Sequence, residues 1–184
     1  MLIIDIINKL SFCLKTSRIG PDLPFTHWML YYKASMYKLC KKKFFYFADD
    51  AEMRPGAYAV GCNKISIGSR VIIRPGTMLF GETIINFEKS IIIESDVMIG
   101  CGVHIYVNNH RFDRTDIPFI EQGYFPDEQV ILKRGCWIGA NVIILPGVII
   151  GENTVIGAGS VVTKSIPAGV LAAGNPAKIL KSII

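Results

Sequence analysis

The sequence predicts an all-β chain wound as a parallel β-helix, chiefly because a large aliphatic residue returns every six positions. The repeat runs through three stretches that are separated by two breaks. Its members are Ile67, Ile73 and Leu79, then Ile93, Ile99 and Ile105, then Leu132, Ile138, Ile144, Ile150, Ile156 and Val162. A helix returns side chains to one face every 3.6 residues and a strand every two, so neither explains this spacing. A hexapeptide repeat is typical of parallel β-helices.

A second, smaller residue follows the large one after four positions and supports the same fold. The set is Val71, Thr77, Thr83, Val97, Val103, Cys136, Val142, Val148, Thr154 and Ser160. In a triangular coil each hexapeptide makes one short strand and one corner, so that three of them complete a rung and both positions point inward. Rungs stabilise one another by stacking. An all-β sandwich is the alternative, but alternation of period two would not also keep a six-residue spacing.

Glycine often comes directly after the large residue. These glycines are Gly68, Gly100, Gly139, Gly151 and Gly157. We expect them to relieve the backbone at the corners of the coil, where a positive φ costs other residues free energy.

Length, composition and charge fit one domain of this kind. The chain has 184 residues and is 51% hydrophobic, which suits a prism with an apolar interior. Its net charge of +5 lies mostly in residues 1–50, which hold eight Lys or Arg and four Asp or Glu. Residues 51–184 hold twelve and eleven, so the coil is nearly neutral. No groove-reading motif or aromatic RNA platform is visible, and we expect no nucleic-acid partner.

The cysteines are odd in number and form no CxxC pair. They are Cys13, Cys40, Cys62, Cys101 and Cys136. We expect reduced thiols in a cytosolic protein. Cys136 occupies a small inward position, where it acts as a small hydrophobe, and a catalytic cysteine is the alternative.

Residues 1–60 are expected to form a helical cap segment and residues 61–184 the coil. Apolar residues recur at helical spacing in residues 3–14 and again in residues 25–40. The first run is too short and too polar to span a membrane and lacks the features of a signal peptide. Two roles stay open: the helices cover the strand edges of the first rung, or residues 1–43 contact an anionic membrane surface.

The two breaks in the repeat are where function is expected. One lies between Thr83 and Ile93. The other follows Ile105: residues 107–129, VNNHRFDRTDIPFIEQGYFPDEQ, offer polar residues, prolines and a glycine in place of inward aliphatics. This segment must loop out of the coil. Long ordered loops on rigid scaffolds commonly carry binding or catalytic groups.

Three histidines are present, and one of them lies at the root of this loop. They are His27, His104 and His110. His104 precedes inward-pointing Ile105 and should point outward from a coil face. His110 is our candidate for a catalytic base, because the pKa of imidazole lies near neutral. A solvated surface histidine is the alternative.

The C-terminal third continues the coil without interruption. Residues 137–181 read WIGANVIILPGVIIGENTVIGAGSVVTKSIPAGVLAAGNPAKILK. Small residues on the outside of a coil let a flat, extended ligand lie close along the prism. Lys164 and Lys178 can meet phosphates at its far end, although solvated charges are the alternative for both.

Residues 65–181 resemble the hexapeptide-repeat acyltransferases, which fold as left-handed parallel β-helices. The resemblance is to the branch related to maltose and galactoside O-acetyltransferases and to the acetyltransferases of capsule and lipopolysaccharide gene clusters. It is carried by NNHRFD, TDIPFIEQG, WIGANVIILPGVIIGENTVIGAGSVVTK and AAGNPAKIL. The resemblance implies acetyl-CoA as donor and a homotrimer with each active site between two prisms.

The resemblance also implies roles for residues. His110 matches the catalytic histidine of the family. Matches to the contacts with coenzyme A are Trp137, Gly139, Ala140, Ala158, Thr163, Lys164 and Lys178. The nearest candidates for acceptor contacts are Asn86, Glu88, Asn109 and Asp113. A serine acetyltransferase would carry a much larger helical domain than residues 1–60 provide.

These features predict a cytoplasmic O-acetyltransferase that acts on a sugar or glycan intermediate in surface polysaccharide biosynthesis, with His110 as general base. An attachment of residues 1–43 would place it at the inner face of the membrane. An antibiotic acetyltransferase, an amino-sugar N-acetyltransferase and a non-enzymatic β-helix scaffold stay open as alternatives. The same fold hosts zinc carbonic anhydrases, but their metal needs three histidines around one cleft. The coil holds only His104 and His110, so we expect no metal.

Overall fold

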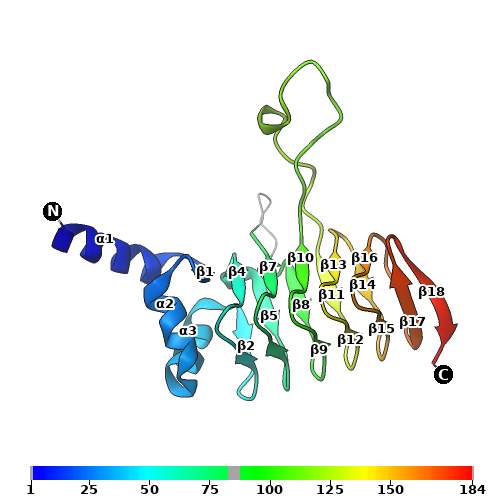
Figure 1. Ribbon diagram of the computed structural model, residues 1–184, viewed down its shortest axis with the longest axis horizontal. Coiled ribbons are helices and arrows are strands. Elements are labelled where there is room, and N and C mark those ends of the chain that lie inside the picture. Colours follow the sequence, from blue (N-terminus) through cyan, green and yellow to red (C-terminus); the bar gives the residue numbers. More distant parts are fainter. Residues whose placement is uncertain (1, 83–87, 184) are drawn as a thin grey trace.

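A triangular coil of stacked rungs forms the body of the protein (Figure 1). The computed structural model describes residues 2–82 and 88–183. Each rung contributes one strand to each of three faces, which we call faces A, B and C. Strands of neighbouring rungs pair in parallel; Ile105, for example, pairs with Leu79 on one side and Ile144 on the other. The predicted parallel β-helix is confirmed.

The strands are short, and successive strands pass from face B to face C to face A. Face A consists of β4 (Tyr58–Val60), β7 (Met78–Phe80), β10 (His104–Tyr106), β13 (Ile143–Ile144) and β16 (Val161–Val162). Face B consists of β2 (Tyr46–Phe47), β5 (Ile65–Ile67), β8 (Ile91–Ile93), β11 (Val130–Leu132) and β14 (Ile149–Ile150). Face C consists of β3 (Glu52–Met53), β6 (Ile72–Ile73), β9 (Met98–Ile99), β12 (Trp137–Ile138), β15 (Val155–Ile156), β17 (Val170–Gly174) and β18 (Ala177–Ser182).

The interior of the coil is lined by the two predicted inward positions. Every large aliphatic residue of the repeat is at most 3% exposed, and so is every smaller one that the structure describes. Thr83 lies outside the described residues. The Thr154 hydroxyl donates to the carbonyl oxygen of Pro167, and the Ser160 hydroxyl to that of Gly157, each over 2.6 Å. The polar members of the small column therefore find partners inside the coil.

The glycines after the large residues are required by close packing between rungs and not, as predicted, by a positive φ. None of the five adopts a positive φ. A Cβ on Gly100 would lie 2.5 Å from the backbone nitrogen of Ala140, and one on Gly139 would lie 2.5 Å from that of Ala158. The backbone of the next rung thus leaves no room for a side chain. The positive φ falls two residues later, at Asn141 in the rung of Gly139.

The coil begins with β2, earlier than the boundary near residue 60 that the sequence predicts. Phe47, Met53 and Ala59 fill the large inward position of this first rung, and each is at most 1% exposed. They keep the six-residue spacing but differ widely in size. The 3₁₀ helix η2 (Cys62–Lys64) then inserts extra residues before β5. For these two reasons the repeat is not evident in the sequence before Ile67.

Four short helical elements precede the coil. They are α1 (Leu2–Lys15), α2 (Pro24–Trp28), η1 (Met29–Tyr31) and α3 (Lys33–Lys43). The predicted second helix is broken, because Tyr32 has an extended backbone (φ −120°, ψ 124°) between η1 and α3. Met36, Leu39 and Cys40 of α3 are buried and join the core of the coil, next to β2 and β3. α3 therefore covers the open end of the prism, whereas α1 extends away from it (Figure 1).

Antiparallel pairs close both ends of the coil. β1 (Arg18–Ile19) pairs with β4 at the start of face A, and β17 pairs with β18 at the end of face C. The extended loop, residues 107–129, leaves the coil after β10 and contains the 3₁₀ helix η3 (Phe119–Glu121) (Figure 1). None of the described helices has the length and apolar character needed to cross a bilayer.

Candidate active site

His110 lies at the neck of the extended loop, where the two ends of the loop run side by side. The peptide N–H of Phe125 donates to the carbonyl oxygen of Asn109 over 2.9 Å. His110 pairs with Tyr124 in this antiparallel ribbon, and their ring centroids lie 4.1 Å apart. The imidazole is exposed to solvent. It is therefore held in place by its neighbours and can still be reached by a ligand.

The root of the loop is fastened by side chains that the sequence analysis did not single out. The side-chain amide of Asn108 donates to the carboxylate of Asp127 over 2.8 Å and to the carbonyl oxygen of Glu82 over 3.2 Å. Asp127 is only 4% exposed. This contact joins the two ends of the loop just below His110. The sequence hints at this contact only because Asn108 and Asp127 lie near the two ends of the segment that interrupts the repeat.

The body of the loop carries two exposed ion pairs between close neighbours in the sequence. Asp113 pairs with Arg111, and this guanidinium lowers the pKa of the Asp113 carboxyl. Asp116 pairs with Arg114 in the same way. Asp113, predicted as an acceptor contact, is thus already engaged by a neighbour in the loop.

The other predicted acceptor contacts are distributed around the neck and the first break. Asn109 is exposed and precedes His110 on the neck. Glu88 is exposed and follows the first break of the repeat, while Asn86 lies outside the described residues. Since the carbonyl of Glu82 accepts from Asn108, the edge of the first break meets the root of the extended loop.

Ala140 and Ala158 lie in adjacent rungs at the corner between faces C and A. The peptide N–H of Gly159 donates to the carbonyl oxygen of Ala140 over 2.8 Å and holds the two rungs together. Ala158 is exposed and Ala140 half-buried, so the corner presents backbone and methyl groups to the outside. Gly139 is buried beneath Ala158, which gives it a packing role between rungs.

Trp137 stands on face C beside this corner. Its side chain is 50% exposed, and it pairs in register with Met98 of the preceding rung, which is 58% exposed. Arg70 and Arg74 border the same hollow of about 130 Å³. Adjacent exposed apolar side chains mark surfaces that contact other molecules. Neither arginine was singled out by the sequence analysis, because nothing local links them to Trp137.

The remaining predicted contacts with coenzyme A lie at two different corners. Thr163 and Lys164 follow β16, at the corner between faces A and B, where the extended loop also leaves the coil. Lys178 is exposed on β18 at the end of face C. The predicted residues therefore form two sets. One set is His110, Thr163 and Lys164 at the A–B corner; the other is Trp137, Gly139, Ala140, Ala158 and Lys178 on face C and at the C–A corner.

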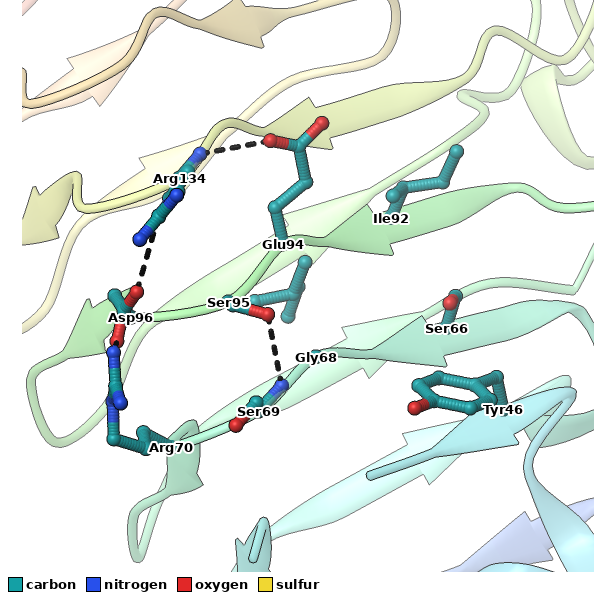
Figure 2. A pocket seen from close by; sticks show the side chains of 11 residues that line it. Tyr46, Ser66, Gly68, Ser69, Arg70, Ile92, Glu94, Ser95, Asp96 and Arg134 are labelled. Atoms are coloured by element: carbon teal, nitrogen blue, oxygen red, sulfur yellow. Dashed lines mark hydrogen bonds and ion pairs between the residues drawn. The ribbon is translucent and has the colours of Figure 1, made fainter. Parts of the chain in front are cut away.

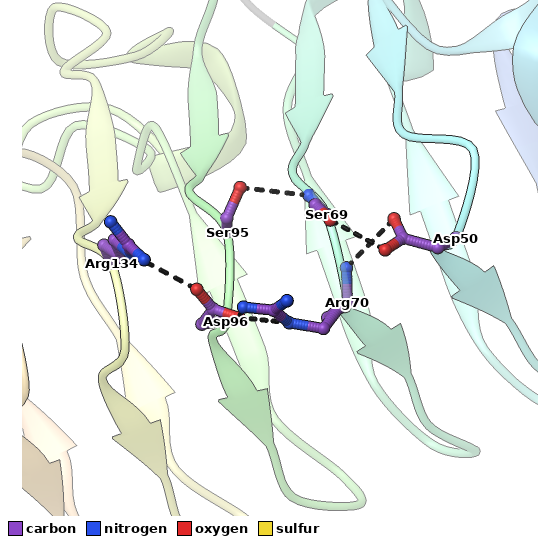
Figure 3. Close-up of polar contacts among 6 residues, drawn as sticks. All are labelled: Asp50, Ser69, Arg70, Ser95, Asp96 and Arg134. Carbon is purple, nitrogen blue, oxygen red and sulfur yellow. Dashed lines mark hydrogen bonds and ion pairs between the residues drawn. The ribbon is translucent and has the colours of Figure 1, made fainter.

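A shallow groove of about 500 Å³ lies on face B and contains none of the residues that the sequence predicts for the site (Figure 2). Its charged side chains are paired across the rungs (Figure 3). Arg70 and Arg134 both bond to the carboxylate of Asp96, and Arg70 lowers the pKa of that carboxyl. Glu94 accepts from Lys133 over 2.9 Å. We interpret this set as an ion-pair ladder between rungs, because each charge in it already has a partner of opposite sign.

Among the residues that the structure describes, the other histidines and the cysteines form no metal site. His104 faces outward on β10, as predicted, with its Nδ1 3.2 Å from the Tyr106 hydroxyl oxygen. Across residues 2–82 and 88–183, no group of three or more His, Cys, Asp or Glu is arranged to hold a metal ion. The five cysteines are free thiols. Cys136 is buried, which raises the pKa of its thiol to about 12 and makes it a poor nucleophile.

Known proteins match this chain in the repeat and in the fold. Residues 130–164 match the bacterial transferase hexapeptide family (six repeats). A maltose O-acetyltransferase from Clostridium difficile 630 is 25% identical, with 97% of this chain and 88% of that chain covered and a TM-score of 0.73. A galactoside acetyltransferase in complex with coenzyme A is 27% identical, with 90% and 84% covered and a TM-score of 0.72.

A further similar structure comes from the N-acyltransferases. It is a variant of an N-acyltransferase from Bacillus cereus in complex with dTDP and coenzyme A, 25% identical, with 79% of this chain and 87% of that chain covered and a TM-score of 0.62. The family match falls on the uninterrupted rungs from β11 to β16. These findings confirm the predicted resemblance: the chain is similar to hexapeptide-repeat acyltransferases and shares their fold, a left-handed parallel β-helix.

Proposed function

We propose that the protein is an acetyl-CoA-dependent O-acetyltransferase that acts on a sugar or glycan intermediate in surface polysaccharide biosynthesis. The observation that carries the proposal is the exposed imidazole of His110, held at the neck of a loop that is fastened to the coil. The similarity to maltose and galactoside acetyltransferases supports a sugar as acceptor.

The proposed reaction is a direct transfer. The imidazole of His110 accepts the proton of an acceptor hydroxyl while the hydroxyl oxygen attacks the thioester carbonyl. The new C–O bond forms, the C–S bond breaks, and the leaving thiolate of coenzyme A takes up the proton from the imidazolium, which returns His110 to its neutral form. Proton transfer to a positioned base contributes about 10²–10⁴ in rate. A backbone N–H of the coil would stabilise the tetrahedral oxyanion.

The donor fits the C–A corner in shape and in polarity. Its pantetheine arm is long and thin, and Ala140 and Ala158 leave a strip of small groups along that corner. The exposed indole of Trp137 offers an apolar contact beside the strip. Lys178 on face C is an exposed ammonium group that suits the phosphates of coenzyme A, and Lys164 is a second one at the A–B corner. No metal takes part in this mechanism.

The two corners favour a site between two copies of the chain. A prism directs its corners away from one another, so one copy cannot turn both sets of residues toward the same ligand. The A–B corner with His110 would face the C–A corner with Ala158 of the neighbouring copy. A closed ring of three copies, a homotrimer, would complete three identical sites.

N-acetylation of an amino-sugar is the second candidate function. The similarity to the Bacillus cereus N-acyltransferase, whose structure holds dTDP and coenzyme A, favours it over antibiotic acetylation and over a non-enzymatic scaffold. An amine acceptor in its ammonium form must lose a proton before it attacks, so His110 would have the same role.

Release of free thiol from acetyl-CoA tests the proposal. The purified protein is incubated with sugars, nucleotide-sugars, amino-sugars, an aminoglycoside and chloramphenicol, beside His110→Ala and the loop control Arg114→Ala. We expect release with a hydroxyl sugar that His110→Ala lowers about 10²–10⁴-fold and Arg114→Ala leaves unchanged. Release only with amino-sugars would establish the second candidate. Absence of coenzyme A binding in calorimetry would refute both.

A further inference from the structure

We propose that the N-terminal segment docks the protein on an anionic lipid surface, with α1 lying in the plane of the interface. This inference concerns where the enzyme works and does not depend on the identity of the acceptor. It rests on an uncovered apolar helix, on the way that helix is attached, and on the charges and aromatic rings around it.

Most of the apolar side of α1 is uncovered, and only its C-terminal end, at Cys13, packs against the rest of the chain. Helical spacing places six large residues along one side, and each is between 38% and 72% exposed. They are Leu2, Ile3, Ile6, Ile7, Leu10 and Leu14. Only Cys13 of this helix is buried. Figure 1 shows α1 extending away from the coil. The opposite side is mostly polar but also carries exposed Ile4 and Phe12. An apolar stripe of this extent on an amphipathic helix is typical of helices that lie in membrane interfaces.

α1 is firmly attached at its C-terminal end. Lys43, at the end of α3, is 7% exposed, and its ammonium group donates to the carbonyl oxygen of Cys13 over 2.9 Å. It also donates to the carbonyl oxygens of Leu14 and Thr16. These bonds satisfy carbonyls that the end of a helix leaves without partners. The helix is therefore fixed to the cap at one end and presents the rest of its length.

The surroundings of α1 suit the boundary of a bilayer. Exposed aromatic rings lie on the neighbouring helices, and exposed lysines lie on α1 and α3. The aromatic residues are Phe25, Trp28 and Tyr31, with Tyr32 just before α3; the lysines are Lys9, Lys15, Lys33, Lys38 and Lys42, beside Lys41, which already pairs with the carboxylate of Asp49. Aromatic rings favour the level of the lipid head groups, and lysines add attraction to anionic phosphates.

Charge complementarity selects the lipid surface over a second copy of the chain. Residues 1–50 hold eight basic and four acidic residues, whereas residues 51–184 hold twelve and eleven. The coil of another copy is nearly neutral and offers no excess of acid to these lysines. None of the described helices can cross a bilayer, so the contact would be peripheral.

Vesicle flotation at low salt tests the inference on the full chain. Vesicles of phosphatidylcholine with about one quarter phosphatidylglycerol are compared with vesicles of phosphatidylcholine alone. The test variant is Ile3→Asp with Ile7→Asp on the apolar side of α1. The matched control is Asn8→Asp with Ser11→Asp on its polar side, which changes the net charge by the same amount. Coenzyme A binding and light scattering report on folding and oligomeric state.

The inference predicts binding of the unaltered chain to the anionic vesicles and at least about tenfold weaker binding to the neutral ones. The variant on the apolar side should bind at least about tenfold more weakly than the control pair, with unchanged coenzyme A binding. Equal binding by both variants would refute the role of the apolar side. Absence of vesicle binding, together with dissociation of the oligomer in Ile3→Asp/Ile7→Asp, would assign α1 to a contact between copies and overturn the inference.

Discussion

The coil and the extended loop differ in how much of their side chains they bury, and this difference separates the stability of the chain from its proposed chemistry. The coil buries two columns of side chains and bonds each rung to the next through its backbone. In the loop, residues 107–129, only Val107 and Asp127 at its two ends are buried. Its large apolar residues Phe112, Phe119 and Ile120 are between 61% and 82% exposed. Changes in the coil should therefore affect folding, and changes in the loop should affect mainly catalysis.

The largest effect on stability is expected from a cavity in the large inward column. Ile138 is fully buried, and Ile138→Ala should lower the free energy of unfolding by about 2–5 kcal/mol. Ile149 is 40% exposed on face B, and Ile149→Ala should cost less than about 1 kcal/mol. Denaturant unfolding of both variants measures the difference. Equal losses would mean that the interior of the coil is not its main source of stability.

A smaller but still substantial effect is expected where two rungs touch. Gly139→Ala would place a methyl group 2.5 Å from the backbone nitrogen of Ala158, and backbone cannot move aside as a side chain can. We expect a loss of about 1–3 kcal/mol. Gly123 lies in the loop with a φ of 76° and open space around it, so Gly123→Asn is the matched control. Thermal unfolding should place this control within about 0.5 kcal/mol of the unaltered chain.

The coil and the extended loop meet at the root of the loop, so a change there should alter both the free energy of unfolding and the turnover. Asp127→Ala removes the partner of the Asn108 amide and should lower the free energy of unfolding by about 1 kcal/mol. Turnover should fall as well, because the neck that carries His110 loses the hydrogen bond between Asn108 and Asp127 that joins its two ends. Hydrogen exchange of the neck amides should quicken, while exchange in the rungs stays slow. Asp116→Asn, which changes an exposed pair in the loop body, should alter neither quantity.

The smallest effect concerns His27 in the N-terminal cap. Its Nε2 accepts from the peptide N–H of Gly56 over 3.2 Å, and burial lowers its pKa below the usual 6.5. Between the two pKa values the unfolded chain binds a proton that the folded chain does not, so stability falls as the pH falls below about 6.5. His27→Gln should flatten this part of the stability profile. A thermal unfolding series from neutral to mildly acidic pH measures it, and an unchanged slope would remove His27 from this role.

The fold was predictable because its signal is local and repeated. Each hexapeptide from Ile67 onward carries the same large and small inward residues, so many independent matches identify one architecture. The first rung escaped prediction because Phe47, Met53 and Ala59 share a position but not a size. The extended loop was predictable as an interruption of the same pattern.

The site was only partly predictable because its geometry depends on contacts between distant residues. Asn108 and Asp127 are 19 residues apart, and no short motif marks their bond. The reason for glycine at 139 lies in the backbone of the next rung, which the local sequence does not display. Likewise, the sequence names His110 and Ala158 but does not indicate that they occupy different corners of the prism.

Mixing two inactive variants tests most directly the central claim that loop and coil come from different copies. His110→Ala removes the proposed base at the A–B corner, and Ala158→Trp fills the C–A corner, where Ala158 is exposed and outside the core. Each alone should be inactive. Under the proposed trimer, an equal mixture that is dissociated and reassembled should recover about a quarter of the unaltered activity, because that share of neighbouring pairs supplies one intact corner of each kind. A mixture as inactive as its parents would contradict the account and would mean that each chain builds its own site.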